Sequence, residues 1–208
     1  MSVKRRKGAF IVLEGPDKSG KSTQAALLAR ALRAQGREVI HTREPGGTSF
    51  AEKIRAILLD KRHKVEPMAE LLLYEAARAQ HTAEVVLPAL RAGKIVISER
   101  YTLATLAYQG FARGLALPVI RRLNAIASFD TKADLTVVLD IPEPSFKTRD
   151  RKRRLDRLES EPVTFRRKVR EGYKRLARRE PACVLLDGTL PVEVLHRKLL
   201  LLSRRFSS

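Results

Sequence analysis

Short apolar segments alternate with segments of helical periodicity along this chain, and the alternation constrains the fold more than any other feature. The apolar segments are rich in Val, Ile and Leu, as in strands buried on both faces, and they span residues 9–14, 38–42, 94–98, 135–140 and 183–187. The periodic segments predict helices over 21–35, 49–59, 67–92, 117–128 and 161–179. Because parallel strands need crossover connections, we predict a three-layer α/β fold with helices flanking a five-stranded parallel sheet.

The composition favours a single soluble domain over residues 1–208. No apolar run reaches the roughly 18 residues of a membrane-spanning helix, and the longest run, 194–202, is interrupted by basic residues. Residues 1–7 form a basic tail, but the apolar stretch behind it contains Glu14 and Asp17, unlike a signal peptide. Cys183 is the only cysteine, which excludes an internal disulfide and a cysteine-based metal site. We therefore expect a cytoplasmic protein.

A strong positive charge is the second global feature. The chain has 42 Lys and Arg residues against 23 Asp and Glu residues, a formal net charge of +19, which attracts polyanions. Residues 147–180 hold 15 basic and 6 acidic residues, but only Phe165 and Tyr173 are interleaved as aromatics. Stacking platforms for single-stranded nucleic acid are therefore missing. We expect nucleic acid to bind the basic surface non-specifically at most.

The densest charge lies within 149–157 and includes Arg151, Lys152 and Arg153. Charge of this density cannot be buried without partners. The segment is either a basic lid, over about 147–160, that closes on phosphates, or a plain solvated surface. The pattern alone leaves both interpretations open.

A glycine-rich loop follows the first predicted strand and precedes the first predicted helix. Its sequence, Gly15-Pro-Asp-Lys-Ser-Gly-Lys-Ser22, matches Gly-x4-Gly-Lys-Ser in the strand-to-helix context that this motif requires. Loop amides can wrap phosphate oxygens, Lys21 can reach the β- and γ-phosphates, and Ser22 can coordinate Mg²⁺. The alternative is a turn that merely starts a helix. We predict a P-loop fold, with nucleotide phosphates held by Gly15, Pro16, Asp17, Lys18, Ser19, Gly20, Lys21, Ser22 and Thr23.

Further polar clusters follow two other predicted elements. Arg43 begins a second glycine-rich turn at the same predicted sheet edge, where it would suit a phosphate or simply be solvated. Tyr74, Arg78 and His81 share one helix face, which fits either base stacking or a core stripe.

An acid and a base end the predicted strand at 94–98. Glu99 at a strand end beside a phosphate loop can hold Mg²⁺ directly or through water, and Asp140, which ends another strand, competes for that role. We favour Glu99 over Asp140 as the Mg²⁺ ligand, because the neighbouring Arg100 supplies a cation that bound phosphates would need.

Taken together, these motifs resemble the thymidylate kinases of the P-loop nucleoside monophosphate kinase group. The resemblance runs from about residue 9 to residue 199. The residues that carry it are Leu13 to Gln24, Thr42 to Thr48, Leu73 to His81, Ser98 to Tyr101, Ala107 to Gly110 and Leu155 to Glu159.

The resemblance implies transfer of the γ-phosphoryl group of MgATP to dTMP, which gives dTDP and ADP in dTTP biosynthesis, and it implies a homodimer. It also implies roles in catalysis and in binding the acceptor nucleotide. Arg43 and Arg100 would grip the acceptor phosphate, Tyr74 would lie against thymine, and Arg78 would reach a base carbonyl. The remaining implied roles fall to Thr105 and Gln109 at the base edge, Tyr108 beside the sugar, Asp17 at the 3′-hydroxyl, and Lys21, Arg100, Arg151, Lys152 and Arg153 in catalysis.

Several positions depart from the family pattern. Glu99 stands where the family usually has Asp, which can place a water molecule between the carboxylate and the metal. Lys18 gives charge without the fork of an arginine, Lys152 takes the place of the lid arginine, and Ala104 replaces a small hydroxyl residue near the base. Two other functions fit such a chain, namely another P-loop nucleoside monophosphate kinase and a weakly catalytic nucleotide-binding module.

Overall fold

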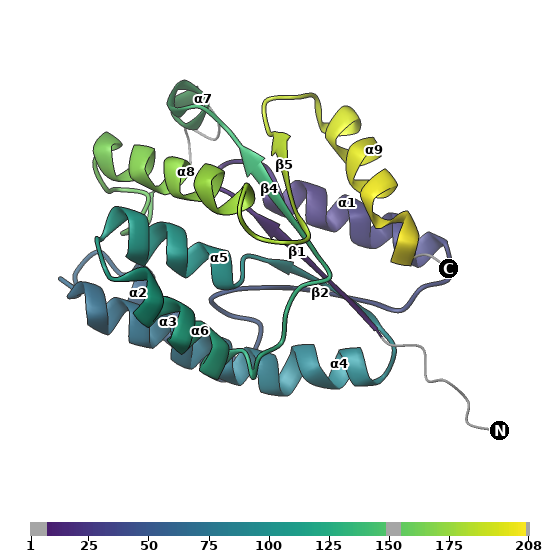
Figure 1. The fold of residues 1–208 in the computed structure, drawn as a ribbon, viewed down its shortest axis with the longest axis horizontal. Helices are drawn as coiled ribbons and strands as arrows, with labels where there is room; N and C mark the ends of the chain where they lie inside the picture. Colours follow the sequence, from purple (N-terminus) through teal and green to yellow (C-terminus); the bar gives the residue numbers. More distant parts are fainter. Residues whose placement is uncertain (1–7, 149–154, 207–208) are drawn as a thin grey trace.

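A twisted parallel sheet forms the centre of the computed structural model, which describes residues 8–148 and 155–206 (Figure 1). Within these residues the strands pair in the order β2-β3-β1-β4-β5, and each pair is parallel. The strands are β1 (Ala9–Glu14), β2 (Val39–Arg43), β3 (Ile95–Glu99), β4 (Leu135–Asp140) and β5 (Cys183–Asp187). The five-stranded parallel sheet predicted from the alternation is confirmed.

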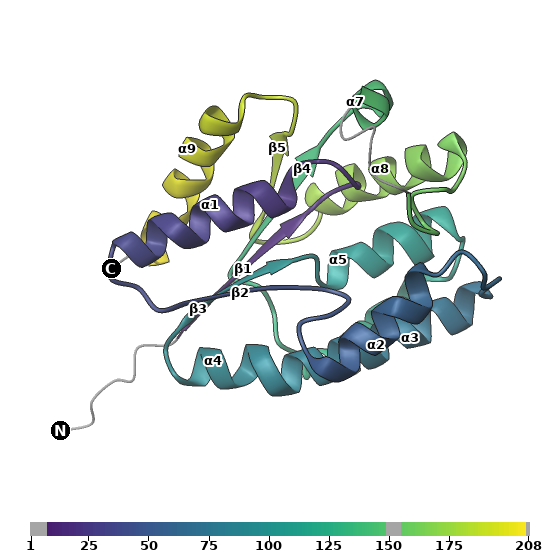
Figure 2. The same ribbon diagram turned by 180° about the vertical axis from the view of Figure 1, so that it is seen from behind.

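Helices cover both faces of the sheet, as a doubly wound fold requires. Helices α1 and α9 lie on one face, and the remaining long helices lie on the other (Figures 1 and 2). The helical elements are α1 (Lys21–Ala34), α2 (Ser49–Leu59), α3 (Pro67–His81), η1 (Thr82–Val86), α4 (Leu87–Arg91), α5 (Thr102–Thr105), η2 (Leu106–Ala112), α6 (Leu117–Ala127), α7 (Glu143–Thr148), α8 (Val163–Ala177), α9 (Val192–Ser203) and η3 (Arg204–Phe206).

The predicted helices are all present, and two details differ from expectation. The helix expected over 67–92 contains a π-helical segment, η1, between α3 and α4. Helix α9 is not among the helices predicted from periodicity, because its last two turns are apolar on most sides. None of the helices within 8–148 and 155–206 is long and apolar enough to cross a membrane.

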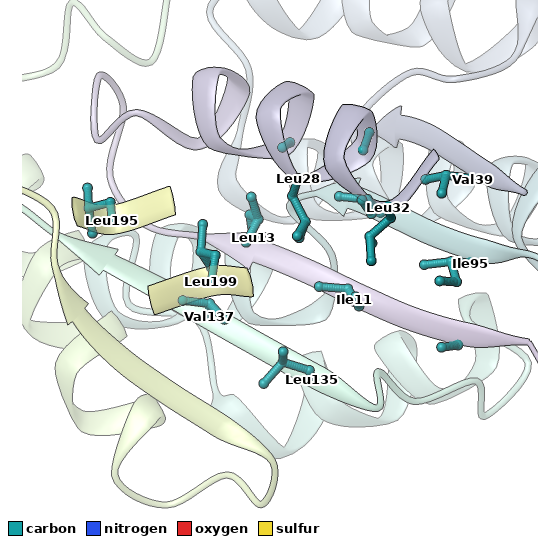
Figure 3. Packing of buried hydrophobic residues seen from close by; sticks show 14 of the residues in the cluster. Ile11, Leu13, Leu28, Leu32, Val39, Ile95, Leu135, Val137, Leu195 and Leu199 are labelled. Carbon is teal, nitrogen blue, oxygen red and sulfur yellow. The ribbon is translucent and has the colours of Figure 1, made fainter. Parts of the chain in front are cut away.

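Residues on β1 alternate between two apolar cores. Ile11 and Leu13 pack in one core with residues of α1 and α9, and Figure 3 shows Leu13 next to Leu28 and Leu199. The intervening side chains face the other layer, where Phe10 meets Tyr101 edge to face with ring centroids 4.9 Å apart. Burial on both faces explains why this strand is a continuous apolar run.

The strand register brings the candidate site together at one sheet edge. Leu13 on β1 and Arg43 on β2 both pair with Glu99 on β3, so these strands end at the same level. Ligands of open parallel sheets bind beyond the carboxyl ends of the strands. The glycine-rich loop after β1, the turn after β2 and the Glu99-Arg100 pair therefore lie at a common rim.

Candidate active site

The glycine-rich loop connects β1 to α1 in a conformation that its glycines permit. Gly15 has a φ of 135°, and a Cβ there would lie 2.4 Å from the Leu139 carbonyl oxygen, so only glycine fits. Gly20 has a φ of 96° and precedes the first residue of α1. The first-turn amides of α1 are thus left free to bind an anion. Residues 17–23 line a cavity of about 750 Å³.

Lys21 is folded back onto this loop. Its side chain is 7% exposed, and Nζ donates hydrogen bonds to the Gly15 carbonyl at 3.1 Å and to the Pro16 carbonyl at 2.8 Å. Burial, and next the positive charge of Arg100, lower the pKa of Lys21 to about 7. When a nucleotide binds, its phosphate oxygens would take the place of these two carbonyls as hydrogen-bond acceptors for the amine.

Ser22 and Glu99 form a pair of oxygen donors on the wall of the same cavity. The Ser22 hydroxyl donates to Glu99 Oε2, and His41 Nε2 lies 3.0 Å from Glu99 Oε1. Burial alone would raise the pKa of Glu99, but the hydrogen bonds from His41 and Ser22 bring it below its usual value. A hydroxyl beside an ionised carboxylate fits Mg²⁺, which keeps several waters and takes other ligands from phosphates. Within the described residues there is no cluster of three His, Cys, Asp or Glu side chains that could hold a metal by themselves.

Arg100 lines the cavity formed by residues 17–23, called the phosphate cavity below, and also a second cavity next to it. It has a left-handed backbone, with φ at 72°, and its guanidinium contacts Asp17 and donates to the Gly15 carbonyl at 3.2 Å. The same guanidinium donates to the hydroxyls of Tyr108 and Tyr173, each at 3.0 Å. The charges of Arg100 and Lys21 lower the pKa of Asp17 against the opposing effect of burial, which keeps this carboxylate ionised.

A second, smaller cavity of about 60 Å³ adjoins the first across Asp17 and Arg100. It is bounded by aromatic and polar side chains that the sequence assigned to the acceptor nucleotide. Those that line it are Asp17, Tyr74, Arg100, Thr105, Tyr108 and Gln109. Its walls combine two aromatic rings, Tyr74 and Tyr108, with polar and charged side chains, so they can contact both the face and the polar edge of a flat ring.

Gln109 is held by a buried carboxylate behind the cavity. Its Nε2 donates to Glu70 Oε1 at 2.8 Å, and Glu70 is fully buried. Arg113 also donates to Glu70, at 3.2 Å, and Arg157 Nη2 forms an ion pair with it at 2.6 Å. The bond to Glu70 fixes the orientation of the Gln109 amide, whose carbonyl oxygen is the group that can accept a hydrogen bond from a base.

Arg78 does not line the small cavity itself, but it contacts Glu44 and Thr105, which do. It is 1% exposed and is bonded to Glu44 at 2.9 Å, Glu75 at 2.7 Å and the Tyr101 carbonyl at 2.9 Å. Nη1 also contacts Asn124 at 2.5 Å. The expected contact between Arg78 and a base carbonyl stays a prediction, and it requires one of these bonds to be exchanged.

Arg43 lines the phosphate cavity from β2. Its side chain is half exposed and donates to both carboxylate oxygens of Glu52, at 3.2 and 3.1 Å. A bound phosphate would have to compete with Glu52 for it. Arg151, Lys152 and Arg153 lie outside the described residues.

Arg55, Asp156 and Glu159 also line these cavities, although no binding or catalytic role was predicted for them. Arg55 on α2 lines both cavities and donates to the Pro45 carbonyl at 2.9 Å. Asp156 and Glu159 line the phosphate cavity, where the amide of each donates to the carboxylate of the other, at 3.1 and 2.9 Å. Asp156 and Glu159 belong to the motif over 155–159 that carries the resemblance, whereas Arg55 belongs to no motif.

Two cavities share Asp17 and Arg100, one suited to a polyphosphate and one to a flat ring. A P-loop enzyme that moves a phosphoryl group between two nucleotides needs this arrangement, and the fold and the site place the chain in that class.

Comparison with known proteins narrows the class. The thymidylate kinase family model matches residues 13–199. The chain is 50% identical over 200 residues to thymidylate kinase of Syntrophotalea carbinolica, covering 90% of this chain and 92% of that protein. It is 44% identical to thymidylate kinase of Deinococcus radiodurans, covering 92% and 94%. The crystal structure of thymidylate kinase from Ehrlichia chaffeensis superposes with a TM-score of 0.79 at 30% identity, over 95% of this chain and 99% of that one. The chain belongs to the thymidylate kinase family.

Proposed function

We propose that the two cavities at the carboxyl edge of the sheet carry out the reaction of this family in this chain. The reaction transfers the γ-phosphoryl group of ATP to dTMP and gives dTDP and ADP, a step of dTTP biosynthesis. The main observation in support of these residue roles is that the two cavities share lining residues. Asp17 and Arg100 border both cavities, so a donor bound along residues 17–23 would meet an acceptor bound beside Tyr74 at Arg100.

Positioning and charge neutralisation account for the chemistry. Lys21 would exchange its bonds to the Gly15 and Pro16 carbonyls for phosphate oxygens, and Arg100 would bind the acceptor phosphate in place of Asp17. The phosphate of dTMP is already ionised at neutral pH, so no general base is required. Asp17, once released from Arg100, is free to accept a hydrogen bond from the sugar. Arg43 would contribute a further cation to the acceptor phosphate.

Ser22 and Glu99 are the residues that would hold Mg²⁺, as oxygen donors in mutual contact on the cavity wall. A Mg²⁺ ion held by these two residues would supply positive charge against the negative charge that spreads over the transferring group. The cations of the predicted lid, Arg151, Lys152 and Arg153, are proposed to complete the charge neutralisation and exclude water.

A homodimer is proposed from the exposed apolar side chains on three neighbouring helices. Helix α3 packs against both α2 and α6, and Ile126 on α6 is 65% exposed. The large exposed apolar residues of these helices are Phe50, Ile57, Met68, Leu72, Val119 and Ile126. An exposed apolar patch of this kind marks an interaction surface. We further propose a single-domain, cytoplasmic enzyme whose basic surface binds nucleic acid only non-specifically.

The experiment that tests the function is ADP release, coupled to a reporter reaction, with dTMP, dUMP, dCMP and dGMP offered singly. We expect dTMP to be the best acceptor by kcat/KM. Equal or faster turnover of a nucleotide whose base is not thymine would identify a different nucleoside monophosphate kinase. Binding of ATP and dTMP without formation of dTDP at micromolar enzyme and with Mg²⁺ would identify a nucleotide-binding module with little catalysis.

A further inference from the structure

His41 contacts the carboxylate of Glu99 from the neighbouring strand. The two residues lie on β2 and β3, where His41 pairs with Ile97 and Arg43 pairs with Glu99, so the imidazole must reach two residues along the partner strand. Its Nε2 lies 3.0 Å from Glu99 Oε1. A carboxylate oxygen accepts hydrogen bonds, so His41 Nε2 is the donor in this contact.

The two oxygens of this carboxylate have different partners. Oε1 is bound by His41, and Oε2 is bound by the Ser22 hydroxyl at the start of α1. The Glu99 side chain is 15% exposed and His41 is 27% exposed, so the carboxylate lies at the cavity wall and the imidazole lies partly in solvent beside it. A glutamate has several rotatable bonds to fix, and ordering such a side chain costs free energy. Two hydrogen bonds from different elements hold it with Oε2 toward the phosphate loop.

From this geometry we infer that His41 is a positioning residue that orients Glu99 for the divalent cation of the bound nucleotide. The inference rests on the proposed role of Glu99 at the metal. His41 binds Oε1, so Oε2, which lies beside the Ser22 hydroxyl, is the oxygen that would face the cation or a water bound to it. Partners that orient a metal-binding carboxylate typically contribute about tenfold or more to metal affinity.

The alternative is a structural bond that merely joins β2 to β3. Backbone pairing already joins these strands along their whole length, from Val39 with Ile95 to Arg43 with Glu99. A purely structural contact would change the stability of this edge without changing metal affinity. Metal affinity, measured directly, therefore separates the two roles.

The test is the affinity of Mn²⁺ for the enzyme–ADP complex by electron paramagnetic resonance, with Mg²⁺ affinity obtained by competition. The variants are His41→Ala, His41→Gln, Glu99→Asp, Glu99→Ala and the double variant of His41→Ala with Glu99→Asp. We expect His41→Ala to weaken Mg²⁺ binding roughly tenfold, with the KM for dTMP unchanged. His41→Gln should restore most of the affinity, because its amide nitrogen can donate from a similar place.

The aspartate background provides the matched control. Glu99→Asp shortens the side chain and withdraws the carboxylate from His41, so adding His41→Ala there should change Mg²⁺ affinity less than twofold. Wild-type affinity in His41→Ala, or loss of affinity that His41→Gln does not rescue, would overturn the inference. If Glu99→Ala also leaves Mg²⁺ affinity unchanged, the proposed metal site itself is wrong. If Glu99→Ala weakens it and His41→Ala does not, only the role of His41 fails.

Discussion

Binding of ATP should draw a proton from solution onto Lys21. In the free protein Nζ is buried against the Gly15 and Pro16 carbonyls, and burial together with the charge of Arg100 lowers its pKa to about 7. A bound triphosphate places several negative charges beside the amine and favours its charged form, so the pKa must rise in the complex. Above pH 7, Lys21 is therefore mostly neutral in the free protein and charged in the complex with ATP.

The size of the effect follows from the shift. At pH 8, one unit above the pKa, about nine-tenths of the free molecules carry neutral Lys21 and must take up a proton on binding. Each pKa unit corresponds to about 1.4 kcal/mol, so ATP should bind about tenfold more weakly at pH 8 than to the fully protonated protein. Affinity should fall further as pH rises, until the pKa of the complex is passed.

Titration calorimetry at pH 8 in two buffers of different ionisation enthalpy measures the proton uptake. We expect about 0.9 proton per ATP analogue for the wild-type protein and close to none for Lys21→Met. The variant Lys61→Met removes an exposed lysine after α2 and serves as the matched control, with uptake unchanged. Binding heats that do not depend on the buffer, or equal uptake in Lys21→Met, would refute the assignment of Lys21.

Three shorter predictions concern catalysis, stability and assembly. Lys21→Ala should lose nearly all dTDP formation while its circular dichroism spectrum stays that of the wild type; retained turnover would mean that the phosphate loop is misassigned. Arg78→Met leaves the buried carboxylates of Glu44 and Glu75 without their cation, so urea unfolding should show a loss of about 3–5 kcal/mol, and a loss under 1 kcal/mol would contradict the network described. Ile126→Glu places a charge on the apolar patch of α2, α3 and α6, so sedimentation should show a monomer at concentrations where the wild type is a dimer, and an unchanged dimer would exclude this face.

The apolar runs predicted the sheet because its central strands β1, β3 and β4 are buried almost throughout, although the edge strands β2 and β5 are partly exposed, unlike the expectation of burial on both faces. Residues of β1 are buried on both faces, so the strand is a continuous apolar run with clear ends. The helix predicted over 49–59 matches α2 at both ends, since Thr48 caps it by accepting a hydrogen bond from the Ala51 amide at 3.0 Å. Secondary structure could therefore be predicted where a single capping residue or a continuous apolar segment determines where an element begins and ends.

The surroundings of the site residues could not be predicted, because they depend on residues that are distant in sequence. The shared helix face of Tyr74 and Arg78 is present, but Glu44, 34 residues earlier, determines that Arg78 is buried in an ion-pair network. In the same way, Gln109 owes its orientation to Glu70, 39 residues before it. His41 carries no motif at all, and only the pairing of β2 with β3 brings it to Glu99.

A crystal structure with a non-hydrolysable ATP analogue and dTMP bound together would show whether the two nucleotides meet at Arg100. We expect the triphosphate along residues 17–23 with Lys21 on its oxygens, thymine beside Tyr74, and Arg100 turned from Asp17 to the acceptor phosphate. A pyrimidine bound away from Tyr74, or a triphosphate away from Lys21, would contradict this expectation.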